Sequence, residues 1–364
     1  KKLMMAPPPP RQRPLRTAEL FSGLGGWRLA AEGLLEVVVA VDHSDQCNAV
    51  YRHNFGGEAP LQRRIETLEA KDLGDDIECL LMSPPCQPYT RQHELRDDDP
   101  RGAALRRVLE LVKDLPRLKL VCLENVVGFE RSQVFRHLRQ SLTAADWRLT
   151  AWHLSPTMIG VPNERPRLFF TAVRTMASSS SCSSLEEEQI LLLRRWPVPM
   201  EDTTPRPVSD YLEEEADETS DDFVLRVPED LLEKSKAWCL DVVDGSATST
   251  ACFTRSYGRF VRGTGSVLCV GAALPSDLGL SSPEARRFDR EWRKKLPTTA
   301  RLRYFAPREI ANLLGFPRSF HIPDDLMSHR AKWAALGNAL HVDAARAVIT
   351  YALHHLPPPF DENQ

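Results

Sequence analysis

A cysteine enclosed by prolines stands directly after a short apolar run. Cys86 lies in the segment Ser83-Pro84-Pro85-Cys86-Gln87-Pro88, and the apolar run covers residues 79–82. The prolines stiffen the backbone and prevent regular structure, so the thiol is held at the carboxyl end of the expected strand. Open α/β sheets place their sites at that edge. We therefore predict that Cys86 is a nucleophile, because a structural cysteine would not need the surrounding prolines.

Charged side chains accompany two further apolar runs. Glu124 opens the segment Glu124-Asn125-Val126 at the end of run 120–123, while Arg165 and Arg167 lead into run 167–173. An acid at the end of a parallel strand faces the same crevice as Cys86. Alternate residues of an extended segment share a face, so both arginines are predicted to point into one pocket. A capping acid and a solvated arginine pair are the alternatives.

A glycine-rich turn follows the first apolar run, at Phe21-Ser22-Gly23-Leu24-Gly25-Gly26. Its glycines allow close approach of a ligand, and the helix that follows favours an anionic group at its N-terminus. Asp42, at the end of the next run, can hold both ribose hydroxyls of a nucleoside cofactor. A tight turn without a ligand is the alternative. A nicotinamide-dependent oxidoreductase would need different glycine spacing, and it leaves Pro-Pro-Cys-Gln unexplained.

Strand and helix patterns alternate around these segments. Apolar runs predict strands at 15–21, 37–41, 79–82, 120–123, 147–154 and 167–173. Helical spacing predicts helices at 27–34, 45–53, 103–113, 133–145, 307–314, 328–336 and 341–355. Repeated βα units indicate a mostly parallel sheet with helices on both faces, that is, an α/β fold.

Composition and charge exclude several classes of protein. The chain has 364 residues, is 42% hydrophobic and 27% charged, and carries a net charge of −3. No apolar run approaches the ~18 residues of a membrane span. The eight cysteines form no C-x-x-C pair, so we expect a reducing compartment, no disulfides and no metal site. Residues 286–308 are strongly basic and residues 201–222 strongly acidic; each block is a binding surface or an ordinary solvated face.

Together the motifs resemble those of the cytosine-5 methyltransferases. The glycine turn is similar to the family's cofactor motif, Pro-Pro-Cys-Gln to its nucleophile motif, Glu-Asn-Val to its acid motif and Arg165-x-Arg167 to its arginine motif, all in the family's order. Gly337-Asn338 is similar to its last motif. The resemblance implies a Rossmann-like S-adenosylmethionine-dependent methyltransferase fold with a smaller target-recognition domain. It places the cofactor against the glycine turn and Asp42, with Ile65, Glu66, Ser83 and Asn338 as further contacts.

Composition predicts the arm and the linker of this chain, and the resemblance implies its two domains. We expect a Pro/Arg arm at 1–14, a catalytic cofactor-binding domain at 15–175 plus 326–356, and a Ser/Glu-rich linker at 176–190. A target-recognition domain at 191–325 and a tail at 357–364 complete the expected division.

A narrower match favours the tRNA-methylating branch of this family, which acts on an anticodon-loop cytosine of aspartate tRNA. It rests on Cys252-Phe253-Thr254, on the nearby Tyr257-Gly258, and on the stretch from Arg303-Tyr304-Phe305 to Phe316-Pro317. Aromatic and arginine side chains interleave without any acid between 253 and 262, which suits single-stranded RNA. The candidate substrate-binding residues are Cys252, Phe253, Thr254, Arg255, Tyr257, Arg259 and Arg262.

Two alternatives remain open. A DNA cytosine-5 methyltransferase would use identical chemistry, and DNA could be a weaker substrate of a tRNA enzyme. A nucleic-acid-binding protein that has lost catalysis is disfavoured, because the cysteine, acid and arginine motifs are all present. Ala339 stands where the family usually has serine, and Tyr89 where it usually has phenylalanine. A tRNA substrate implies a cytoplasmic location, with the nucleus as a second compartment.

Overall fold

The structure is a computed structural model that describes residues 13–57, 60–85, 102–143, 147–175, 192–200, 202–213, 225–233, 239–274, 296 and 298–357. Cys86, the Ser-rich segment, most of the Pro/Arg arm, and large parts of the acidic and basic blocks lie outside these residues. The chain divides into two compact units. Unit 1 falls within Lys1–Leu154, Pro166–Glu201 and Leu340–Gln364, and unit 2 within Ser155–Arg165 and Asp202–Ala339.

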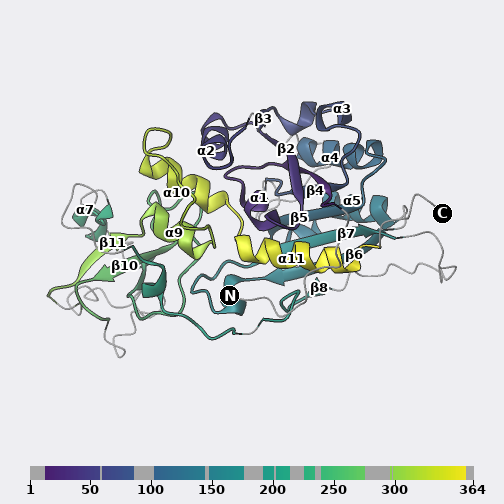
Figure 1. Cartoon of the computed structure of the whole chain (residues 1–364). Helices are drawn as coiled ribbons and strands as arrows, with labels where there is room; N and C mark the ends of the chain where they lie inside the picture. The colour runs from purple at the N-terminus through teal and green to yellow at the C-terminus, as the bar shows by residue number, and fades with distance from the viewer. Residues whose placement is uncertain are drawn as a thin grey trace. The chain divides into compact units, whose positions relative to one another are not determined.

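An eight-stranded sheet forms the centre of unit 1 (Figure 1). Its strands lie in the order β3-β2-β1-β4-β5-β7-β6-β8. Their bounds are β1 Arg16–Leu20, β2 Glu36–Asp42, β3 Leu61–Gln62, β4 Cys79–Met82, β5 Leu120–Val126, β6 Trp147–Leu154, β7 Arg167–Arg174 and β8 Leu192–Leu193. The strands from β3 to β5 are parallel, whereas β7 runs antiparallel to both β5 and β6. The predicted mostly parallel sheet is confirmed, and β7 reverses direction because no crossover α-helix joins it to β6.

Helices cover both faces of this sheet. They are α1 Gly26–Ala31, α2 Asp45–Phe55, α3 Ala70–Leu73, α4 Ala103–Asp114, α5 Gln133–Thr143 and α11 Val342–His355. Leu105 of α4 and Leu138 of α5 share one hydrophobic cluster with Leu80 and other residues of one sheet face. On the opposite face the ring of Trp27 in α1 meets Phe169, and helix α11 packs on β7. The central strands are therefore buried on both sides, which explains their continuous apolar sequences.

A three-stranded sheet and an aromatic cluster organise unit 2. Strand β10 (Ser266–Val270) lies between β9 (Asp241–Val243), which is parallel to it, and β11 (Arg301–Tyr304), which is antiparallel. The helices of unit 2 are α7 Glu229–Leu232, α9 Pro307–Leu313 and α10 His329–Asn338. We call the mutually packed rings of Phe253, Tyr257, Tyr304, Phe305 and Trp333 the aromatic cluster.

Helix α10 lies in unit 2, although the sequence analysis assigns its residues to the cofactor-binding domain. The reason is its apolar face. The ring of Trp333 sits in the aromatic cluster, and its indole nitrogen donates a hydrogen bond to the Phe305 carbonyl at 2.9 Å. Among the described residues, no helix is long and apolar enough to cross a membrane.

Candidate active site

Four predicted site residues occupy one row at the carboxyl edge of the large sheet. Leu20 is in register with Val41 and Met82, and Met82 with Leu123. The residues that follow these four are Phe21, Asp42, Ser83 and Glu124. Since parallel strands in register end together, the glycine turn, the acid of β2, the start of the proline segment and the acid of β5 share one edge of unit 1.

The glycine turn has the backbone that its sequence predicts. Phe21 has a φ of 56°, which is strained for a residue with a bulky side chain. Gly25 has a φ of 83°, which glycine adopts without strain. A Cβ on Gly25 would lie 2.3 Å from the Phe55 ring, so this turn also needs glycine for packing. Strain of this kind persists only where the surroundings fix it, and it gathers at ligand-binding turns.

Asp42 shapes the turn from the neighbouring strand. One of its carboxylate oxygens accepts a hydrogen bond from the Gly23 backbone N–H at 2.9 Å, and the other accepts one from the Ser44 N–H at 2.8 Å. Ser83 is fixed in a similar way, since its hydroxyl accepts a hydrogen bond from the Trp27 indole at 2.9 Å. Both predicted cofactor residues therefore hold the turn and the first helix in place.

The turn has room and polarity for a nucleoside cofactor. The hydroxyl of Ser22 is buried and forms no hydrogen bond with any described residue. A Cβ built on Gly23 would meet no described atom within 4 Å, so open space adjoins the backbone there. Ile65 is buried in the short 3-10 turn Ile65–Thr67. Burial opposes ionisation of Glu66, but hydrogen bonds from its own backbone and from Arg64 outweigh burial and lower its pKa.

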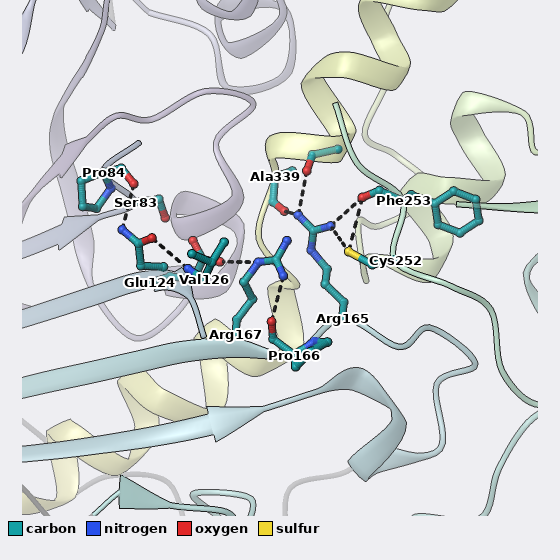
Figure 2. Close-up of polar contacts among 12 residues, drawn as sticks. Ser83, Pro84, Glu124, Val126, Arg165, Pro166, Arg167, Cys252, Phe253 and Ala339 are labelled. Carbon is teal, nitrogen blue, oxygen red and sulfur yellow. Dashed lines mark hydrogen bonds and ion pairs between the residues drawn. The ribbon is translucent and has the colours of Figure 1, made fainter. Parts of the chain in front are cut away.

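Glu124 and Arg167 form an ion pair between neighbouring strands. Val126 is opposite Arg167 in the antiparallel register of β5 and β7, so the side chains of Glu124 and Arg167 emerge on one face. The Arg167 Nε lies 3.2 Å from a Glu124 carboxylate oxygen, and both side chains are largely buried (Figure 2). The carboxylate is thus held in a fixed direction at the row described above.

Asn125 links the acid motif to the proline segment. Its side-chain amide donates a hydrogen bond to the Pro84 carbonyl at 3.1 Å, and its oxygen accepts one from the Val126 N–H. The amide is buried. This role of Asn125 was not predicted, although the sequence carries a signal for it: an amide stands directly beside the predicted acid. The nucleophile prediction for Cys86 itself falls outside the described residues.

Arg165 has different partners from Arg167. Its guanidinium donates hydrogen bonds to the Phe253 and Ala339 carbonyls at 2.8 and 2.6 Å (Figure 2). It donates a third to the Gly337 carbonyl at 2.9 Å, and all three partners belong to unit 2. That both arginines point into one pocket stays a prediction. The strand alternation on which it rests does not extend to residue 165, because β7 begins only at Arg167.

The predicted RNA-binding segment is partly core. Phe253 and Tyr257 are 1% and 2% exposed and belong to the aromatic cluster, so their rings cannot stack on bases. Arg255, Arg259 and Arg262, in contrast, are exposed. Cys252 is half-buried and its sulfur lies 3.4 Å from the Arg165 guanidinium, and Thr254 fixes the segment through a backbone hydrogen bond to Thr264 at 2.9 Å.

The last predicted motif, Gly337-Asn338, packs closely against Thr254 and Arg255. A Cβ on Gly337 would lie 2.2 Å from the Thr254 carbonyl carbon, so only glycine lets the end of α10 approach so closely. Asn338, predicted as a cofactor contact, is the exposed last residue of α10. The six described cysteines are free thiols, and the described residues contain no group of three or more side chains suited to a metal ion.

Comparisons with known proteins identify the family. The C-5 cytosine-specific DNA methylase family matches residues 15–354, and the chain belongs to this family. A human relative, tRNA (cytosine(38)-C(5))-methyltransferase, is 31% identical over 92% of this chain and 98% of its own length. The DNA (cytosine-5)-methyltransferase of Dictyostelium discoideum is 28% identical over 90% of this chain and 91% of its own. The crystal structure of the S. pombe Dnmt2 methyltransferase has a TM-score of 0.73 and 28% identity, covering 94% of this chain and 99% of that one.

Proposed function

We propose that this protein methylates carbon 5 of an anticodon-loop cytosine, cytosine 38 of aspartate tRNA, with S-adenosylmethionine as the methyl donor. The observation that carries the proposal is the Glu124–Arg167 pair in one row with the glycine turn, beside the anchored start of the proline segment. The tRNA substrate is supported by several relatives of about 30% identity that bear the name tRNA (cytosine(38)-C(5))-methyltransferase.

In the proposed reaction, Cys86 is the nucleophile. Its thiolate adds to carbon 6 of cytosine, and the electron pair of the 5,6 double bond becomes available at carbon 5. When bound, S-adenosylmethionine would supply the methyl group that carbon 5 takes up, and its sulfur would leave as a neutral thioether. Loss of the carbon 5 proton and expulsion of the Cys86 thiolate then restore the aromatic ring. The buried thiols Cys79 and Cys122 cannot replace Cys86, because burial raises the pKa of both thiols well above its usual value.

Glu124 and Arg167 prepare the site for this addition. Nucleophilic addition at carbon 6 builds negative charge at N3. In the proposal the protonated form of Glu124 gives its proton to N3, and a carboxyl oxygen accepts a hydrogen bond from the exocyclic amine. The ion pair with Arg167 fixes the direction of the carboxylate before the base arrives. A preoriented group costs less reorganisation during the reaction than a mobile one. Arg165 acts in the proposal as a positioning residue, since it donates hydrogen bonds to three backbone carbonyls and contacts the Cys252 sulfur.

Cofactor binding belongs to unit 1 in this proposal. The Ser22 hydroxyl and the open backbone of Gly23 are suited to the amino-acid end of S-adenosylmethionine, and Asp42 to its ribose. Ile65, Glu66 and Ser83 complete the proposed contacts. Unit 2 serves target recognition, and the protein is expected to act in the cytoplasm, where mature tRNA is found.

A covalent trap tests the chemistry. RNA that contains 5-fluorocytosine at position 38 should form a stable adduct with the wild-type protein, because fluorine cannot leave as a proton does. Cys86→Ala should form no adduct and show no turnover, while it binds S-adenosylmethionine with unchanged affinity. Undiminished methylation by Cys86→Ala would refute the mechanism. Cys79→Ala is the matched control, since it removes a buried thiol at the start of β4, the strand that precedes the proline segment.

Duplex DNA is the second candidate substrate, favoured by the Dictyostelium relative. Extrusion of an unpaired loop cytosine costs less than extrusion of a paired one, and each ~1.4 kcal/mol saved is worth tenfold in rate. We therefore expect labelled S-adenosylmethionine to modify total tRNA much faster than genomic DNA at physiological salt. Equal rates on the two substrates would replace the tRNA proposal with the DNA alternative.

A further inference from the structure

A short turn of unit 2, residues 254–264, is closed tightly at both ends. We call it the arginine turn. The Thr254 N–H donates a hydrogen bond to the Thr264 carbonyl at 2.9 Å, and the Thr264 hydroxyl donates one to the Phe260 carbonyl at 2.7 Å. The Phe260 N–H in turn donates a hydrogen bond to the Ser256 carbonyl at 3.2 Å. The tip of the turn is therefore ordered by its own backbone.

The aromatic cluster forms a solid support beneath this turn. A Cβ on Gly258 would lie 2.5 Å from the Trp333 ring, and one on Gly265 would lie 2.6 Å from the Phe253 and Tyr257 rings. Both glycines have positive φ values, 72° and 143°. Because these two glycines have no side chain, their backbone packs directly on the rings of the aromatic cluster. The turn therefore has little freedom to move. A surface that is ordered in advance loses less conformational entropy when a partner binds.

Phe260 differs from the other aromatic residues of the turn. Its side chain is 57% exposed, and among the described residues only Leu61 is another exposed large hydrophobic. Tyr257, three positions earlier, is buried in the aromatic cluster. An ordered turn could have directed this ring toward the same cluster. It presents the ring to solvent instead, which leaves apolar surface exposed without any benefit to folding.

The charges around Phe260 select one kind of partner. Arg255, Arg259 and Arg262 are exposed on the same turn, and residues 252–265 include no acid. The Arg259 guanidinium lies over the Phe260 ring, 5.3 Å from its centroid. An exposed ring backed by a cation and flanked by further arginines offers stacking and phosphate contacts together. Protein partners without strong negative charge would be repelled by, or indifferent to, the arginines.

We propose that Phe260 stacks on an unpaired base of the RNA substrate, with Arg259 holding the ring in place and Arg255 and Arg262 contacting phosphates. The inference rests on the proposed tRNA function and names the residue that receives a loop base. It also revises the sequence interpretation: the available ring is Phe260, whereas Phe253 and Tyr257 build the support under it.

Three substitutions separate stacking from simple apolar contact. Phe260→Leu keeps a large apolar side chain but removes the aromatic face, whereas Phe260→Trp keeps and enlarges that face. Leu61→Ala removes the other exposed hydrophobic, which belongs to β3 of unit 1, and serves as the matched control. Because Phe260 is exposed, none of these changes should alter the thermal unfolding temperature by more than ~1–2 °C.

Kinetics with tRNA give the first measurement. Phe260→Leu should raise KM for tRNA roughly tenfold, within the range measured for loss of one base stack, with kcat changed less than twofold. Phe260→Trp should retain the wild-type KM, and so should Leu61→Ala. An unchanged KM for Phe260→Leu, or an equal loss in Phe260→Trp, would overturn the stacking role.

A binding experiment keeps the inference separate from the proposed reaction. The probe is an anticodon stem–loop RNA with 2-aminopurine in place of one loop base at a time. Stacking on an aromatic ring should quench its fluorescence at one position, in the wild-type protein and in Phe260→Trp but not in Phe260→Leu. If tRNA is not methylated yet this quenching occurs, the proposed function fails and the stacking surface stands. If tRNA is methylated and no position depends on Phe260, only the stacking inference fails. If Phe260→Leu instead alters the sedimentation of the protein alone, the ring contacts a second copy and the inference is wrong.

Discussion

The close approach of α10 to the Cys-Phe-Thr segment makes Gly337 a sensitive position. In Gly337→Ala the new Cβ would lie 2.2 Å from the Thr254 carbonyl carbon, 2.3 Å from the Arg255 nitrogen and 2.5 Å from the Thr254 oxygen. All three are backbone atoms, so no side-chain rotation can relieve the overlap. To reach ordinary contact distances, the helix end and the segment must separate by roughly 1 Å.

Two effects with opposite signs decide the change in stability. Replacing a helical glycine with alanine stabilises a helix by at most ~1 kcal/mol. Overpacking against a rigid neighbour costs up to ~3 kcal/mol, and the separation also stretches the hydrogen bonds by which Arg165 joins the Phe253 and Gly337 carbonyls. The cost exceeds the gain, so the net destabilisation should be ~2 kcal/mol.

Thermal unfolding followed by circular dichroism tests this balance. For a unit of this size, ~2 kcal/mol corresponds to a fall of ~4–8 °C in Tm. Asn338→Ala is the control, because it changes the exposed neighbour of Gly337 and should shift the unfolding free energy by less than ~0.5 kcal/mol. A Gly337→Ala protein as stable as the wild type, or more stable, would show that the segment yields easily and would refute the packing argument.

Three further predictions concern unit 1. Asn125→Ala should lower kcat ~10-fold with unchanged S-adenosylmethionine affinity, because the Pro84 carbonyl loses its hydrogen bond; an equal loss in affinity, measured by calorimetry, would contradict this. Asp42→Ala should raise the Kd for S-adenosylmethionine at least ~10-fold, because the Gly23 N–H loses its hydrogen bond to the carboxylate. Calorimetry measures this Kd, and an unchanged value would remove Asp42 from the cofactor site. Burial raises the pKa of Glu19 to about 7, so the native state favours its protonated form and stability falls as pH rises from about 4.5 to 7. In the wild type the free energy of unfolding should therefore fall by up to ~3 kcal/mol between pH 5 and pH 8, and in Glu19→Gln this fall should be absent. Urea unfolding at the two pH values measures it, and an equal fall in the wild type and Glu19→Gln would contradict the prediction.

Six of the eight strands of unit 1 were predictable from apolar runs, whereas the two-residue edge strands β3 and β8 were not predicted. Burial on both faces leaves the most direct mark on sequence. Leu80 and Leu81 lie on opposite faces of β4, and both are fully buried, so the run is apolar throughout. Strand direction leaves no such mark. The reversal of β7 depends on the path of residues 155–165, which pass through unit 2 before the chain returns to the sheet.

The aromatic residues of unit 2 show where sequence reasoning reaches its limit. Phe253, Tyr257 and Phe260 stand in one interleaved segment, and spacing alone does not tell which ring is buried. Phe253 and Tyr257 are buried because they pack on Phe305 and Trp333, which lie far later in the sequence. The same distant contacts draw α10 into unit 2. The motif residues were predictable from the sequence. Which of them are exposed and which are buried in the aromatic cluster could be known only from the tertiary structure.

The chain passes between the two units four times, after residues 154, 165, 201 and 339. Unit 1 therefore contains segments from the beginning, middle and end of the sequence. Its last segment bonds to its first: Arg346 of α11 donates a hydrogen bond to the Ala30 carbonyl at 3.2 Å, across a separation of 316 residues. Closing a flexible loop of that length costs about 5 kcal/mol of chain entropy.

This arrangement sets an order of folding during synthesis. A ribosome delivers all the segments of unit 2 before α11 emerges, so unit 2 can fold while the sheet of unit 1 still lacks a helix on one face. A prefolded unit 2 shortens the effective loop that α11 must close. A nascent chain that stops before residue 340 leaves the apolar surfaces of α1 and β7 uncovered. Such chains should be recognised by chaperones and proteases, which makes α11 the segment on which completion of the fold depends.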